Sequence, residues 1–204
     1  MKKVILLFIF SFSIGFLQAQ EVFFQVGKNL SSYVFSDPGN EVASLSSNVG
    51  TAYKIGYSTA KSQDSPFFYD FGVTINEYHA KGYSGKINLD YKTNYLGLFG
   101  SIHCAIIKSE FNNLAISTGV STESIVHGNQ SINSTDYNLL KQEEFKGFVL
   151  SPKIGLQYTY VINSDLNLLM DYSYSRHWNL SKSGTQKLSI QNHGIHFGLS
   201  INMY

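Results

Sequence analysis

The chain has 204 residues, the size of one domain, and its hydrophobic content of 43% is too high for a disordered protein. Aromatic residues make up 15% of the chain and charged residues only 14%, well below the roughly 25% of an ordinary soluble domain. The net charge is +1 and no basic run or arginine cluster suited to phosphates occurs, which argues against a nucleic-acid partner.

The first 19 residues have the three-part plan of a secretory signal peptide. Two lysines precede an apolar run at 4–17, and the small residue Ala19 predicts cleavage directly after it. The run is too short to cross a bilayer of about 30 Å as a helix, so a retained membrane anchor is the weaker alternative. We therefore expect a signal peptide at 1–19 and a single domain at 20–204.

Apolar residues recur at every second position after the signal peptide, which is the period of a β-strand. The pattern predicts eight strands, at about 21–30, 48–60, 67–79, 91–107, 114–126, 147–162, 165–178 and 187–204. One face of these strands is apolar and the other is small and polar. Glycines occur on the polar face in seven of the strands, where they suit a narrow, curved interior: Gly27, Gly56, Gly72, Gly97, Gly119, Gly155 and Gly198.

The predicted connections alternate in length. Short ones occur at 61–66, 108–113 and 163–165, and longer ones occur at 31–47, 80–90, 127–146 and 179–186. This alternation is typical of a membrane barrel with tight periplasmic turns and larger outside loops. In hydrocarbon every backbone polar group needs an internal partner, so a β chain crosses only as a closed ring. We predict an all-β fold, an eight-stranded antiparallel up-and-down transmembrane β-barrel.

The last strand alternates apolar side chains and ends on an aromatic residue, through Phe197, Leu199, Ile201, Met203 and Tyr204. Together with the export signal and the eight alternating strands, it resembles the small Gram-negative outer-membrane β-barrels of OmpA/OmpX size and the PorT-like outer-membrane β-barrel family. The resemblance implies outer-membrane localisation, contact with outer-membrane lipid, and a terminal strand that serves as the assembly signal for the barrel-insertion machinery. Tyr204 departs from this pattern because it is out of phase with Ile201 and Met203.

Five charged residues fall on the polar face, which faces the barrel interior: Lys54, Asp70, Glu123, Lys153 and Asp171. An eight-stranded barrel has room inside for side chains but not for a water-filled pore, so these charges must pair. Their positions relative to the periplasmic turns predict an ion pair between Glu123 and Lys153. We interpret the set as a structural ion network, with a proton or ion pathway as the alternative.

Six tyrosines occur near strand ends on the apolar face and predict an aromatic girdle at the membrane boundary: Tyr57, Tyr69, Tyr158, Tyr160, Tyr172 and Tyr174. Cys104 is the single cysteine, so an internal disulfide is impossible, and it shares the lipid-facing side of Ile102 and Ile106.

The sequence predicts no catalytic, metal or cofactor site. The six histidines show no metal-like spacing with a carboxylate on one face. Outer-membrane lipid-deacylating serine hydrolases also use eight-stranded barrels, but their His-x-Ser motif is missing here.

We therefore expect function to reside in the extracellular loops, as a structural or surface-interaction role of a monomer without enzymatic activity, with an envelope or surface protein as the potential partner. The PorT-like resemblance implies an alternative, an accessory of an envelope protein-secretion machine. A third hypothesis is a soluble lipocalin-like carrier of a hydrophobic ligand. That carrier would need its apolar face inside, and the sparse charge makes its solubility doubtful.

Overall fold

The computed structural model describes residues 20–37, 40–60, 65–84, 87–133, 135–142, 145, 147–179 and 187–203. The predicted signal peptide and Tyr204 lie outside the described residues. Within the described ranges, no helix is long and apolar enough to cross a membrane.

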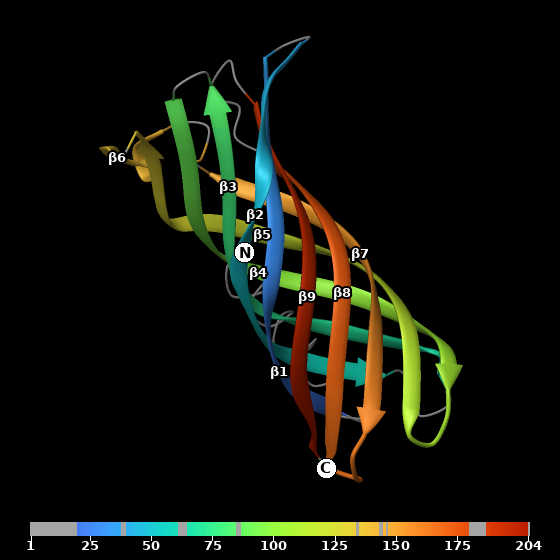
Figure 1. Cartoon of the computed structure of the whole chain (residues 1–204). Helices are drawn as coiled ribbons and strands as arrows, with labels where there is room; N and C mark the ends of the chain where they lie inside the picture. The colour runs from blue at the N-terminus through green and yellow to red at the C-terminus, as the bar shows by residue number, and fades with distance from the viewer. Residues whose placement is uncertain are drawn as a thin grey trace, which may run out of the picture.

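The described chain is almost entirely β-structure (Figure 1). One turn of 3-10 helix, η1 (Leu139–Lys141), follows the short strand β6. The described strands are β1 (Gln20–Asp37), β2 (Asn40–Ala60), β3 (Phe67–Ser84), β4 (Ile87–Lys108), β5 (Asn112–Ile132), β6 (Thr135–Asn138), β7 (Phe148–Val161), β8 (Leu166–Asn179) and β9 (Lys187–Met203). Each of the eight predicted strands corresponds to one of these, and only β6 has no counterpart in the sequence pattern.

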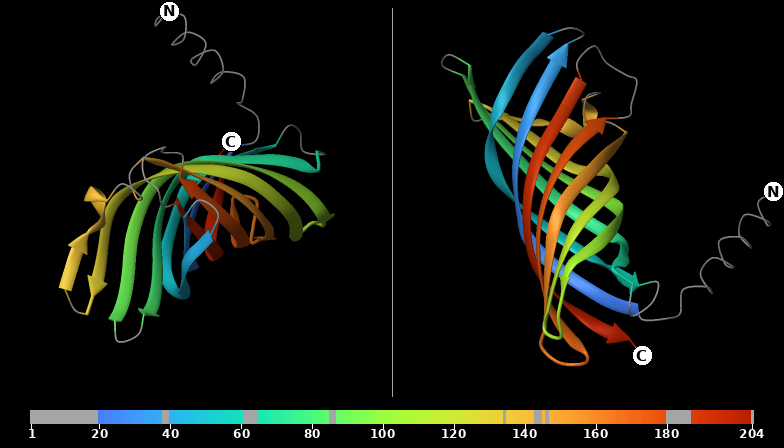
Figure 2. Two further views of the ribbon diagram at one scale, coloured as in Figure 1. Left: turned by 90° about the horizontal axis from the view of Figure 1, so that it is seen from above. Right: turned by 90° about the vertical axis from the view of Figure 1, so that its right-hand side faces the viewer.

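Eight strands close into a ring (Figure 2). They lie in the order β4-β3-β2-β1-β9-β8-β7-β5, all neighbours are antiparallel, and the pairing of β4 with β5 completes the circle. The predicted antiparallel up-and-down barrel is therefore confirmed. β9 pairs with β1 from Met203 opposite Gln20 onward, so the last described strand closes the ring and leaves it without a free edge.

The strands are much longer than a membrane crossing requires. The eight ring strands have 14 to 22 residues, whereas a crossing needs roughly 9–11. We call the end that carries Gln20 and Met203 the terminal end, and the opposite end the hairpin end. The additional length projects at the hairpin end (Figure 1).

Two of the long loops expected from the sequence are mostly strand. β1 runs on to Asp37 and β2 begins at Asn40, while β3 and β4 are separated only by residues 85–86. The expected loops at 31–47 and 80–90 are therefore wrong. Backbone pairing between neighbouring strands continues beyond the membrane where the enclosed side chains still pack together. In the third long connection, β5 extends to Ile132 and turns back into β6.

The apolar face of the barrel points outward. Phe71, Leu156 and Leu199 are 51%, 45% and 46% exposed, and these exposed apolar residues lie on different strands around the ring. On β9 the outward positions from Ile195 to Met203 are all apolar, which spans the roughly nine residues of a crossing strand. This arrangement belongs to a transmembrane barrel and contradicts the lipocalin-like alternative, which needs these side chains inside.

Inward glycines allow neighbouring strands and side chains to approach closely. A Cβ added at Gly198 on β9 would lie 2.1 Å from the carbonyl oxygen of Phe24 on β1. By contrast, the nearest atom to a Cβ added at Gly100 would be the carbonyl oxygen of Asp70 at 4.0 Å.

We therefore expect Gly198→Ala to lower the free energy of unfolding by about 1–3 kcal/mol through overpacking. The matched variant Gly100→Ala should leave stability unchanged or raise it by about 0.5 kcal/mol, because alanine restricts the unfolded chain. Urea unfolding of the folded barrel in micelles measures both. Equal effects at the two glycines would contradict the close packing at Gly198.

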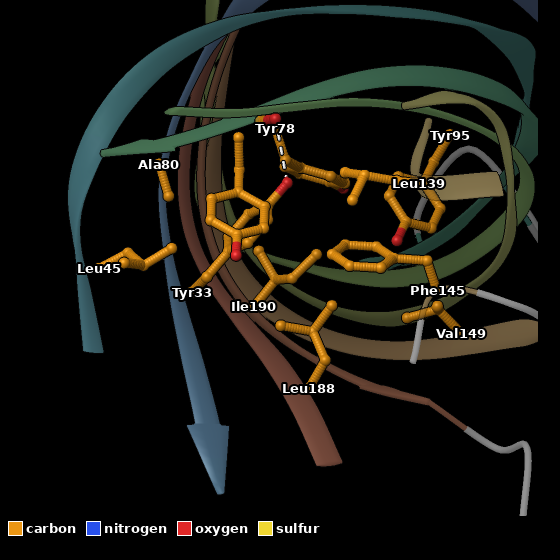
Figure 3. Packing of buried hydrophobic residues seen from close by; sticks show 11 residues of the cluster. Tyr33, Leu45, Tyr78, Ala80, Tyr95, Leu139, Phe145, Val149, Leu188 and Ile190 are labelled. Atoms are coloured by element: carbon orange, nitrogen blue, oxygen red, sulfur yellow. Dashed lines mark hydrogen bonds between the residues drawn. The ribbon is translucent and has the colours of Figure 1, made fainter. Parts of the chain in front are cut away.

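The lumen near the hairpin end is apolar, which the sequence reading did not anticipate (Figure 3). We call this cluster the upper core; its members are Tyr33, Leu45, Tyr78, Ala80, Tyr91, Tyr95, Leu139, Phe145, Val149, Leu188 and Ile190. Leu139 of η1 and Phe145 enter it from the segment between β5 and β7, so this segment folds into the barrel mouth. The expectation of a lumen filled only by polar and small side chains is wrong at this height. Beyond the membrane the outside is aqueous, and an apolar core inside the strands stabilises them there.

Candidate functional site

The five charged residues predicted for the interior all project from inward positions of the lower lumen, nearer the terminal end than the upper core. Lys54 is 9% exposed, Asp70 is 8% exposed and Glu123 is 2% exposed. Lys153 and Asp171 lie on β7 and β8, and Lys153 lines the same internal cavity as Lys54 and Glu123.

The central ion pair joins β2 to β8 across the lumen. Lys54 Nζ lies 3.2 Å from Asp171 Oδ1. His196 on β9 completes the group, because its Nδ1 lies 3.0 Å from the same Asp171 oxygen and 3.3 Å from Lys54 Nζ. The sequence analysis did not identify His196 as a partner of these charges.

The predicted ion pair between Glu123 and Lys153 is wrong. The strand register sets Glu123 opposite Val149 and Lys153 opposite Gly119, so the two residues are offset along their strands. Among the described residues no ion pair joins them. Lys153 Nζ instead lies 4.6 Å from the ring centroid of Phe99, in a cation–π contact.

Neutral donors hold the Glu123 carboxylate. Asn76 and Ser121 donate to its Oε1 at 3.2 and 2.7 Å, and the Tyr78 hydroxyl donates to its Oε2 at 3.1 Å. These three hydrogen bonds compensate for the loss of water around the charge. Because Tyr78 also belongs to the upper core, this carboxylate ties the polar lumen to the apolar plug above it.

A chain of amide side chains crosses the lumen and ends at this carboxylate. Asn192 on β9 donates to Asn29 on β1 at 3.0 Å, and Asn29 donates to Asn76 on β3 at 3.2 Å. Asn76 then donates to Glu123 on β5. The four residues therefore connect opposite sides of the ring.

A second acidic group lies nearer the terminal end. Asp70 Oδ2 on β3 is 3.0 Å from His103 Nε2 on β4, and the Phe68 ring stacks on His103 with a centroid separation of 4.4 Å. The register sets Asp70 directly beside Ser101 and Phe68 beside His103. The sequence analysis did not predict this partner, because it considered the histidines only for metal-like spacing and for a His-x-Ser motif.

The described part of the polar lumen contains a small cavity of about 30 Å³, lined by residues that include Asn29, Lys54, Glu123, Lys153 and His196. This volume holds about two water molecules, because each needs at least roughly 10–15 Å³. The upper core lies beyond this cavity, toward the hairpin end. The described part of the chain also contains no group of three or more metal-ligating side chains.

Ser151 and His177 form an interior hydrogen bond. Ser151 Oγ lies 2.5 Å from His177 Nδ1, and the other ring nitrogen, Nε2, lies 3.2 Å from Ser175 Oγ. Ser151 is 1% exposed and His177 is 2% exposed, and the Tyr78 ring packs edge-on against the imidazole. This pair is enclosed within the barrel wall, out of contact with the lipid-facing surface.

The predicted girdle tyrosines occupy two heights on the outer wall. Tyr57, Tyr69, Tyr158 and Tyr160 lie on the halves of their strands nearer the terminal end. Tyr172 and Tyr174 lie further toward the hairpin end on β8. The Tyr172 side chain is 43% exposed on the outer wall. The Tyr158 hydroxyl group donates a hydrogen bond to Asn112 Oδ1.

The residues predicted as the assembly signal lie outward on β9: Phe197, Leu199, Ile201 and Met203 are each about half exposed on this face, whereas Tyr204 lies outside the described residues. Cys104 is half-buried on β4, and its register partners are Phe67 and Ile116.

The stagger of the strands sets the upper edge of the apolar band. A row of paired outward residues that starts at Leu96 on β4 passes around the ring and returns to β4 at Ile107, nearer the terminal end. A line at constant height must therefore shift by more than one residue per strand relative to the pairing. Toward the hairpin end, outward polar residues interrupt the apolar positions in seven strands, at Lys28, Thr51, Glu77, Asn94, Ser124, His193 and Arg176. Lys28 and Thr51 are register partners, as are Glu77 and Asn94, whereas Arg176, His193 and Lys28 are offset by two residues per strand. We call this set the boundary ring.

A closed ring of eight strands, an outward apolar band and a narrow lumen lined by packed side chains together define a small transmembrane β-barrel.

Comparison with known proteins gives several solved structures with low similarity to this chain. The chain is similar to Neisserial surface protein A (NspA), at 13% identity over 87% of this chain and 96% of that chain, with a TM-score of 0.49. It is also similar to the outer membrane protein OprG from Pseudomonas aeruginosa, at 12% identity over 91% and 97% of the two chains, with a TM-score of 0.47. A third similar structure is the outer membrane enzyme PagL, at 11% identity over 83% and 97%, with a TM-score of 0.42. No protein-family model and no curated protein matches the chain.

Proposed function

We propose that this chain is a monomeric outer-membrane barrel of a Gram-negative cell, without catalysis, that acts as a structural or surface-interaction protein through its hairpin end. The observation that supports this most is the lumen, which is filled at two heights. The Lys54–Asp171–His196 group and its neighbours occupy the lower lumen, and the upper core closes the mouth. Packed side chains at both heights argue against a continuous path for a solute.

The features expected of an exposed interaction surface lie at the hairpin end. The strands extend beyond the boundary ring there, and their outer faces carry ion pairs such as Lys81–Asp90 and Lys92–Glu77. Charged side chains suit water and not hydrocarbon. In this orientation the terminal end faces the periplasm, and the apolar band contacts outer-membrane lipid after insertion by the barrel-assembly machinery.

The interior Ser151–His177 pair supports the absence of catalysis. A serine nucleophile that acts on lipid or on an external substrate must be accessible to that substrate. Ser151 and His177 are only 1% and 2% exposed. His177 is also held by a second serine and not by an orienting carboxylate.

The proposal is tested by fractionation combined with heat-modifiable gel migration. We expect the protein to remain with the outer membrane after alkaline extraction and to change its mobility when boiled, because a closed barrel resists detergent until heated. Recovery in the soluble periplasmic fraction would contradict the proposal.

A conductance measurement tests the filled lumen separately. Purified barrel inserted into a planar lipid bilayer should give no discrete conductance steps, because side chains occupy the lumen at both heights. An unrelated porin inserted under the same conditions serves as the positive control. Reproducible steps from this protein would show an open path and would favour the ion-pathway interpretation of the charges.

A second candidate is the PorT-like role, in which the chain is an accessory of an envelope protein-secretion machine. Strand β6 favours it, because among the described strands it pairs only with β5 and so presents one edge to a partner. Tyr137 on β6 and the adjacent Leu140 are 48% and 38% exposed. Mild crosslinking in cells followed by purification of the barrel tests this role. Reproducible capture of envelope proteins would support it, and a barrel that purifies alone would argue against it.

A further inference from the structure

One side of the boundary ring carries basic side chains without acidic partners. Arg176 on β8, His193 on β9 and Lys28 on β1 are exposed outward residues on three neighbouring strands. Arg176 pairs in register with Gln191, and His193 pairs with Leu30, so the three residues form a diagonal across the strands.

The stagger of the barrel makes this diagonal level with the membrane plane. Moving from β8 to β9 to β1, a line of constant height shifts toward the terminal end by more than one residue per strand. The next outward residue after Gln191 in that direction is His193, and the next after Leu30 is Lys28. Successive Cα atoms of the trio are therefore about 8 Å apart, from one strand spacing and two residue rises.

The charges of this trio are not neutralised by the described chain. Lys28 Nζ donates to Thr51 Oγ1 at 3.2 Å, and Arg176 Nε donates to Ser189 Oγ at 3.2 Å. Neither cation has a carboxylate within ion-pair distance in the part of the chain that the structure describes. On the β3–β4 side, by contrast, Lys92 Nζ lies 3.2 Å from Glu77.

Aromatic side chains on β8 flank the trio, with Tyr172 and Tyr174 toward the terminal end and Trp178 toward the hairpin end. The Tyr172 hydroxyl lies 2.9 Å from His193 Nδ1, and the Tyr174 ring centroid lies 5.0 Å from that of His193. Trp178, two residues beyond Arg176, is 48% exposed. Tyrosine and tryptophan side chains suit the headgroup level of a membrane, where an apolar body meets a polar tip.

We propose that Lys28, Arg176 and His193 form a binding site for the phosphate groups of lipopolysaccharide on the outer wall of β8, β9 and β1. The inference rests on the proposed outer-membrane location, in which the boundary ring lies in the outer leaflet. Cations level with the headgroups bind lipid phosphates, and the apolar band below accepts the acyl chains. Two cations and a histidine spread over three strands suit a glycolipid that carries more than one phosphate.

The test compares lipopolysaccharide binding by the folded full-length barrel with that of the double variant Lys28→Gln/Arg176→Gln, by titration in neutral detergent micelles. We expect the variant to bind about 30-fold more weakly, since each cation near an anionic lipid surface contributes roughly fivefold. Enzymatically dephosphorylated lipopolysaccharide should bind the unaltered protein with a similar loss. The matched control Lys81→Gln/Lys92→Gln removes the same charge from the paired cations of β3 and β4 and should change affinity less than about threefold.

Three results would overturn the inference: unchanged affinity in the double variant, an equal loss in the control, or phosphatidylglycerol that competes as well as lipopolysaccharide. Heat-modifiable migration and membrane fractionation of both variants separate this inference from the proposed function. If Lys28→Gln/Arg176→Gln and Lys81→Gln/Lys92→Gln both insert normally and bind lipopolysaccharide with equal affinity, the binding site is overturned and the proposed function is not. Recovery of the unaltered protein in the soluble fraction overturns both.

Discussion

The Asp171→Asn variant is expected to lose about 3–5 kcal/mol of unfolding free energy, the largest effect of a single charge substitution in the lumen. Asp171 is the carboxylate that lies 3.2 Å from Lys54 Nζ, and both side chains are only 10% exposed. Without it the ammonium group remains in a closed interior with no ionised partner within ion-pair distance. Removal of one partner of a buried pair costs more than the pair itself contributes, because a charge is left uncompensated.

Urea unfolding in micelles, followed by the fluorescence of the single tryptophan, Trp178, measures this loss. The matched control is Asp165→Asn in the exposed turn between β7 and β8, which should change stability by less than about 0.5 kcal/mol.

The double variant Lys54→Met/Asp171→Asn provides the decisive comparison. With both charges removed, position 54 no longer carries an ammonium group that has lost its carboxylate, and most of the lost stability should return. A double variant as unstable as the single one would mean that the Lys54–Asp171 pair is not what stabilises this part of the lumen.

Truncation of the plug is the second large effect. Leu139 is fully buried in the upper core, whereas its neighbour Leu140 is 38% exposed. We expect Leu139→Ala to lower the unfolding free energy by about 2–5 kcal/mol, because it removes packed methyl groups and leaves a cavity. Leu140→Ala removes the same atoms from a partly exposed position and should cost less than about 0.5 kcal/mol.

Urea unfolding gives the global effect of both leucine variants, and limited proteolysis gives the local one. Cleavage between β5 and β7 should become faster in Leu139→Ala, since this segment is held in the mouth by Leu139 and Phe145. Equal stability and equal cleavage of the two variants would show that the segment does not depend on the upper core.

Strand positions and facing could be predicted from the sequence because alternation is a local property of the chain. The pattern through Ile195, Phe197 and Leu199 indicated one apolar face, and these residues are about half exposed on the outer wall. The same reasoning fails at 31–47 and 80–90, where the polar residues predict loops and the structure has strands. Beyond the membrane an outward polar residue is compatible with both a strand and a loop, so composition cannot separate them there.

Partners inside the lumen could not be predicted, because they depend on which strands face each other after closure. Glu123 and Lys153 lie on paired strands, yet the register offsets them. Lys54 and Asp171 are 117 residues apart in sequence and meet only across the closed ring. The histidines that complete these groups, His103 and His196, have no distinguishing local pattern.

The amino-acid sequence by itself determined which face of each strand meets lipid, because a strand in hydrocarbon must present apolar side chains at every second position. Only the tertiary structure decided which inward charges pair, where the upper core begins and which outward residues share one height. These depend on ring closure and on the stagger between strands, and a two-residue change in register would alter them all while leaving every side chain on the same face.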